Sequence, residues 1–71
     1  DNDGCLDQHL APYMGIMDWN RFVEGVRAIH YDGAICFETF GVWDSVDEQL
    51  CPAMVRFIAE AGRMFAQRIM E

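Results

Sequence analysis

Two residues near the start of this 71-residue chain, Asp7 and His9, have the types and spacing of metal ligands. They form an Asp-x-His pair, and in an extended segment the side chains of residues two apart project to the same side. A carboxylate oxygen beside an imidazole nitrogen suits Mn²⁺, Zn²⁺ or Co²⁺. The alternative is an ordinary polar loop, because an Asp-x-His pair often arises by chance. Asp7 and His9 are therefore candidate metal ligands, with the polar loop left open.

Glu38 is the second candidate for chemistry, because of its place at the end of a predicted strand over residues 34–38. In β/α barrels the carboxyl ends of the strands form the active-site face. A carboxylate at that position can bind a divalent metal or act as a general acid or base. The alternative is a solvated glutamate at a strand exit. We therefore take Glu38 as a candidate catalytic and metal-binding residue.

A helix is predicted over residues 19–30, just after the Asp-x-His loop. Apolar residues from Trp19 to Ile29 recur at helical spacing and form one stripe, and Asp18 is well suited to cap the first turn. Gly25 lies inside this stripe, where glycine costs about 1 kcal/mol relative to alanine. We expect a close packing contact at Gly25 that accounts for the missing side chain.

Residues 34–38 carry three apolar residues in succession without polar alternation, which is typical of a strand covered on both faces of a parallel sheet. A short turn is expected at 45–50, and a long helix over 52–69 with Pro52 in its first turn. A single strand cannot satisfy its own backbone groups, because it needs ladder partners on both sides. The order of elements thus predicts the last βα segment of a repeating β/α protein, cut from a larger fold.

The composition restricts the possible functions of the chain. Hydrophobic residues make up 52% of the sequence, which excludes a disordered tail and exceeds what so short a chain can hide. The formal net charge of −7 argues against nucleic-acid binding and against docking on an anionic membrane. Three cysteines without metal-like spacing are expected to be free thiols, which favours a cytoplasmic protein.

Several motifs occur together in a recognisable order. They are Asp1-Asn2-Asp3-Gly4, the Asp7-x-His9 pair, Met17-Asp18-Trp19, and Tyr31-Asp32-Gly33 followed by a strand that ends in Glu38. This arrangement resembles the carboxyl-terminal part of xylose isomerase-like TIM barrels, the sugar phosphate isomerase/epimerase superfamily. The resemblance covers residues 1–71 and implies an α/β fold class: a fragment of a (β/α)₈ barrel with the loop after strand 7, helix 7, strand 8 and helix 8, predominantly helical on its own.

The resemblance also implies a function for the parent protein, a divalent-metal-dependent isomerase or epimerase of a sugar or sugar phosphate. Glu38 matches the strand-eight carboxylate that binds the catalytic metal, and Asp7 and His9 match a metal-binding pair. The metal in the complete parent is expected to be Mn²⁺, Zn²⁺, Co²⁺ or Mg²⁺. The other ligands of the family are missing here, so the isolated chain is expected to be inactive and to bind metal weakly or not at all.

Two other functions remain open at this point. An apurinic endonuclease-type metal phosphoesterase would use the same Asp7, His9 and Glu38, although its parent should be basic. A small non-catalytic helical interaction domain would need no metal. The expected partners are the remainder of the barrel and, for the isolated chain, further copies of itself in a homo-oligomer, because the edges of strand 34–38 and the apolar helix faces would otherwise be bare.

Overall fold

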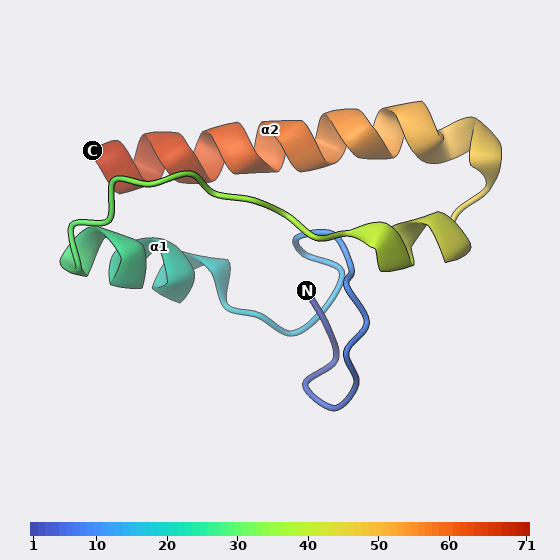
Figure 1. Ribbon diagram of the computed structural model, residues 1–71, viewed down its shortest axis with the longest axis horizontal. Helices are drawn as coiled ribbons and strands as arrows, with labels where there is room; N and C mark the ends of the chain where they lie inside the picture. The colour runs from blue at the N-terminus through green and yellow to red at the C-terminus, as the bar shows by residue number, and fades with distance from the viewer.

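The computed structural model describes all 71 residues and is predominantly helical. Its elements are the α-helices α1 (Trp19–Ala28) and α2 (Cys51–Met70) and the short 3₁₀ helices η1 (Phe40–Asp44) and η2 (Glu48–Leu50). Figure 1 shows α2 along one side, α1 beside part of it, an extended segment running between the two helices, and the N-terminal loop next to η1. The expectation of a mainly helical chain is confirmed.

Helix α1 begins at the predicted residue, Trp19, and ends at Ala28, two residues before the predicted end. The Asp18 carboxylate accepts a hydrogen bond from the N–H of Arg21 at 3.1 Å, which confirms the predicted cap. Trp19 and Val23 are buried on the apolar stripe. The expected packing contact at Gly25 is wrong, because a side chain placed there would meet nothing within 4 Å. Gly25 therefore weakens the helix without a compensating contact.

The predicted strand over residues 34–38 does not form. The chain is extended there, with Ile35 and Phe37 half-buried and Cys36 and Glu38 exposed, so the side chains alternate as in a strand. No second extended segment lies beside it to complete a ladder, and none of the backbone N–H groups of residues 32–40 donates a hydrogen bond within the protein. The strand prediction is wrong for this chain because strand pairing needs a neighbour that the chain does not supply.

Helix α2 begins one residue before the predicted boundary and contains Pro52 in its first turn, as expected. The 3₁₀ helix η2 occupies the predicted turn, and Asp47 caps it by accepting from the N–H of Gln49 at 2.8 Å. No helix of the structure combines the length and the apolar character needed to cross a membrane. All three cysteines are free, as the sequence predicts.

The hydrophobic core is small and is centred on two aromatic rings. Trp19 and Phe65 stack with their ring centroids 4.9 Å apart and their planes 11° from parallel, and Val23 and Ala61 complete the buried cluster. Only seven of the 71 residues are buried. The radius of gyration is 12.9 Å, compared with about 11 Å for a compact domain of this length. The expectation that the chain carries more apolar material than it can hide is confirmed.

Candidate functional site

The N-terminal loop is held in place by its own polar residues. The Asp1 carboxylate accepts a hydrogen bond from the indole N–H of Trp19 at 3.1 Å, and its backbone oxygen accepts one from the N–H of Leu10 at 2.9 Å. The backbone oxygen of Asn2 accepts from the N–H of Ile16 at 2.9 Å. These bonds connect the start of the loop to its end and to helix α1. The two ends of the loop are therefore fixed to each other and to helix α1, which restricts where its middle residues can lie.

Asp3 closes the tip of this loop. Its carboxylate accepts hydrogen bonds from the N–H groups of Cys5 at 2.8 Å and Leu6 at 2.9 Å. These backbone bonds, that from Leu6 first, lower the pKa of the Asp3 carboxyl. Gly4 sits in the left-handed region with φ 84°, where glycine is favoured. The acidic string at the start of the sequence thus shapes the loop.

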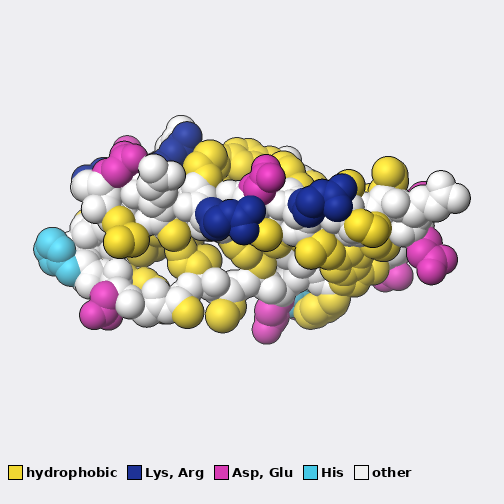
Figure 2. All heavy atoms as spheres, turned by 90° about the horizontal axis from the view of Figure 1, so that it is seen from above, with side chains coloured by type: hydrophobic (Ala, Val, Ile, Leu, Met, Phe, Trp, Pro, Cys, Tyr) yellow, Lys and Arg dark blue, Asp and Glu magenta, His cyan; other side chains and the backbone are white.

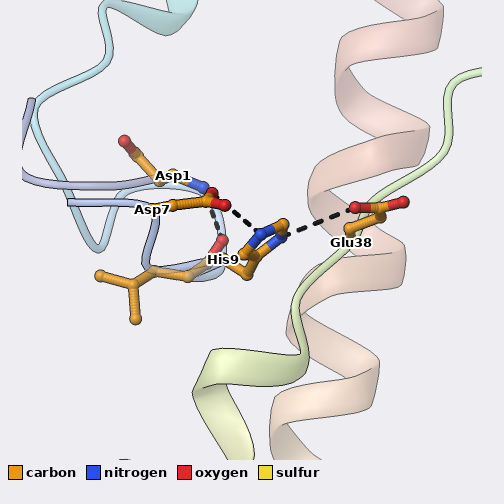
Figure 3. Close-up of polar contacts among 5 residues, drawn as sticks. Asp1, Asp7, His9 and Glu38 are labelled. Carbon is orange, nitrogen blue, oxygen red and sulfur yellow. Dashed lines mark hydrogen bonds and ion pairs between the residues drawn. The ribbon is translucent and has the colours of Figure 1, made fainter.

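The structure brings the three predicted site residues together. His9 lies between the two carboxylates, with its Nε2 2.9 Å from Asp7 Oδ1 and its Nδ1 3.6 Å from Glu38 Oε2 (Figure 3). The imidazole is 22% exposed, whereas the side chains of Asp7 and Glu38 are 88% and 76% exposed. The loop and the extended segment therefore meet at one partly covered histidine.

Two features that the sequence analysis did not identify hold His9 in this position. The imidazole stacks on Phe40 with ring centroids 4.1 Å apart, and the backbone oxygen of His9 accepts the N–H of Gly41 at 3.0 Å. A side chain at Gly41 would collide with the backbone oxygen of Gln8, so only glycine permits this approach. His9 itself has φ 53°, a left-handed conformation in which histidine is several-fold enriched. A loop glycine and an exposed aromatic residue carry no specific sequence signal for this role.

The carboxylates on either side of His9 indicate what could join it. Nε2 lies 2.9 Å from Asp7 Oδ1 and Nδ1 lies 3.6 Å from Glu38 Oε2, so each ring nitrogen has a carboxylate oxygen beside it. When Nε2 carries the proton of the neutral imidazole, Nδ1 is an acceptor beside the Glu38 carboxylate. Two facing acceptors require a cation or a proton between them. Two ligands at about 2.1 Å from a tetrahedral metal lie about 3.4 Å apart, close to the observed 3.6 Å. Metal-bound histidines commonly have a carboxylate beside their other ring nitrogen, and Asp7 lies beside Nε2 of His9.

The donor types therefore fit a divalent metal, but the set is incomplete. No group of three or more His, Cys, Asp or Glu side chains surrounds a common point. Asp7 lies beside Nε2 of His9, whereas Glu38 lies beside Nδ1. Asp7 is therefore placed to orient the imidazole ring. Direct ligation by Asp7 stays a prediction. At most His9 and Glu38 could share one ion in this chain, so further donors have to come from elsewhere.

Comparison of the chain with protein-family models, with curated proteins and with solved structures finds no match to any of them. The resemblance to xylose isomerase-like barrels thus depends on the motif residues alone. The meeting of Asp7, His9 and Glu38 is an independent observation, because the motif order alone does not dictate which side chains touch.

Proposed function

We propose that this chain supplies one side of the metal site of a xylose isomerase-like TIM-barrel enzyme that isomerises or epimerises a sugar or sugar phosphate. The observation that carries the proposal is His9, held between Asp7 and Glu38 from segments about thirty residues apart in the sequence. A cluster that joined only by chance would not be expected to contain all three residues selected by the motif.

Each residue has a distinct role in this proposal. His9 Nδ1 and Glu38 Oε2 would hold the metal, and Asp7, 2.9 Å from Nε2, would orient the ring. A bound divalent ion supplies polarisation of the carbonyl and hydroxyl oxygens of an open-chain sugar. Glu38 is mostly exposed, so its second oxygen is free to move a proton at the neighbouring carbon of the substrate. With only two ligands at the metal position, the isolated chain binds metal weakly and is inactive.

The charge distribution favours a sugar over DNA as the substrate. Residues 1–20 and 28–55, which carry the whole cluster, contain no lysine or arginine. An apurinic endonuclease has to approach a polyanionic backbone, and neutralising its phosphates supplies much of the affinity for DNA. The segments that carry the cluster therefore supply no cation of their own for that purpose. The phosphoesterase therefore remains the second candidate, and its activity is one outcome of the test.

The experiment uses the complete protein that contains this segment. Purified enzyme is assayed with Mn²⁺ for interconversion of aldoses and ketoses, free and phosphorylated, and for cleavage of abasic DNA. Glu38→Gln is expected to lower turnover about 10²–10⁴-fold, while Glu24→Gln on the exposed face of α1 makes the same charge change without effect. Cleavage of abasic DNA, or unchanged turnover in Glu38→Gln, contradicts the proposal.

A further inference from the structure

The extended segment between the two helices has the hydrogen-bonding character of an open sheet edge. None of the nine backbone N–H groups of residues 32–40 has a partner in the protein. Among the carbonyls of this segment, Ala34 accepts only from the hydroxyl of Tyr31, and Thr39 from the N–H of Val42. An extended chain with free donors and acceptors pairs readily with another extended chain.

Apolar surface flanks this segment on both sides. A groove of about 970 Å³ lies between the segment and α2, and most of its lining is hydrophobic, including Val55, Ile58 and Ile69. A smaller recess of about 310 Å³ lies between the segment and α1, and all of its lining residues are hydrophobic. Figure 2 shows hydrophobic side chains on both sides of the arginines on one face of the molecule. The unpaired backbone of the segment is thus flanked by apolar surface, and a partner that pairs with the segment would bury this surface as well.

The surface area of the chain indicates how much would be covered. The accessible surface is 5291 Å², whereas a compact monomer of 8.2 kDa exposes about 4,500 Å². The surplus of roughly 800 Å² equals the share that each partner contributes to a standard protein–protein interface. Thirteen large hydrophobic residues are exposed, and five of them line the groove or the recess beside the segment: Ile29, Tyr31, Trp43, Val55 and Met70. One further copy of the chain is therefore enough to cover the surplus.

We infer that two copies of this 71-residue chain form a symmetric dimer in which the segments over residues 34–38 pair as antiparallel strands centred on Cys36. In this register Glu38 faces Ala34 of the other copy and Ile35 faces Phe37, so apolar side chains meet on the helix-covered side. A register centred on Glu38 would place two carboxylates opposite each other, which is unfavourable. The two-fold arrangement makes the same patch serve both copies.

Charge complementarity supports a second copy as the occupant. The groove is lined by Arg27 and Arg63. Arg27 donates a hydrogen bond to the backbone oxygen of Glu71 at 2.8 Å, whereas Arg63 forms no ion pair within the chain. The incoming segment carries Asp32 and Glu38 close to its ends. The net charge of −7 opposes association, but at physiological salt it is screened beyond about 8 Å. Attraction between the groove arginines of one copy and the carboxylates of the other therefore acts at short range in the interface, whereas salt reduces the repulsion between the net charges of the two copies.

In a complete barrel, neighbouring strands would pair with the same edge, so the test is made on the 71-residue chain itself. Sedimentation equilibrium at micromolar concentration is expected to give twice the chain mass of 8.2 kDa. Cys36→Asp places two carboxylates face to face at the centre of the pair, and should raise the dimer dissociation constant about two- to fivefold. Asn20→Asp on exposed α1 adds the same charge away from the segment and should leave the dimer unchanged.

A second measurement tests the register. In the variant Cys5→Ser/Cys51→Ser, Cys36 is the only thiol, and two copies paired through it bring their Cα atoms within disulfide range. Equilibration in a glutathione redox buffer should yield a covalent dimer, whereas the matched variant that retains only Cys5 should not. A folded monomer by sedimentation and circular dichroism overturns the proposal, as does a dimer that Cys36→Asp does not weaken. Either result leaves the metal-site proposal intact, because that proposal is tested through Glu38 in the complete protein.

Discussion

Truncation of Phe65 to alanine is the perturbation whose effect follows most directly from the fold. The ring is fully buried and stacks on Trp19 at 4.9 Å, and the cluster around it contains only four buried residues. Phe→Ala in a core costs about 3–5 kcal/mol, and the lost aromatic pair adds about 0.5–1.5 kcal/mol. A chain of 71 residues has a total stability of roughly 4–11 kcal/mol. Phe65→Ala should therefore remove most of the stability.

The assay is urea unfolding followed by far-UV circular dichroism and tryptophan fluorescence, with the protein concentration held fixed because association adds to stability. Phe57→Ala is the matched control, since Phe57 lies on the same helix but is 43% exposed. The Phe57→Ala midpoint should stay near that of the unmodified chain, whereas Phe65→Ala should show no cooperative transition or one at far lower urea. Equal midpoints for the two variants would refute the assignment of the core.

Three further predictions concern single positions. Gly25→Ala should stabilise the chain by about 0.5–1 kcal/mol in the same urea assay, because the site is helical and nothing lies within 4 Å; a loss of stability would count against the geometry of α1. Gly41→Ala should separate η1 from the N-terminal loop, since its side chain would strike a backbone oxygen, and loss of the nuclear Overhauser contacts between His9 and Phe40 would report this. Asp3 has a lowered pKa, so its contribution to stability is complete above the usual carboxyl pKa near 4 and is lost as pH falls through the lowered pKa. The amide chemical shift of Cys5 should change with this titration, and the pH-dependent change should be absent in Asp3→Ala.

The two helices could be predicted from the sequence because their signals are local. The stripe that begins at Trp19, the cap at Asp18 and the proline at position 52 each act within one or two turns of the chain. The strand prediction for residues 34–38 failed for the opposite reason. Its side chains do alternate between half-buried and exposed, but a strand is defined by its partner, and pairing is a long-range property that residue types do not reveal.

The residues of the candidate site could likewise be predicted from the sequence, but their arrangement could not. Asp7, His9 and Glu38 could be selected because carboxylates and imidazole have characteristic chemistry, and the structure brings them into contact. How they meet depends on the left-handed conformation of His9, on its stacking with Phe40 and on the close approach of Gly41. These contacts join residues thirty positions apart, so neither the orienting position of Asp7 nor the 3.6 Å gap to Glu38 follows from the motif alone.

Selective relaxation by Mn²⁺ tests most directly the central claim that His9 and Glu38 form one side of a metal site. The chain contains two histidines, and His30, exposed two residues after α1, forms no ion pair with a carboxylate, so it serves as an internal control. Substoichiometric Mn²⁺ should broaden the ring protons of His9 well before those of His30, and Glu38→Gln should abolish the difference while Glu48→Gln retains it. Equal broadening of the two rings, or preferential broadening of His9 that persists in Glu38→Gln, would contradict the claim.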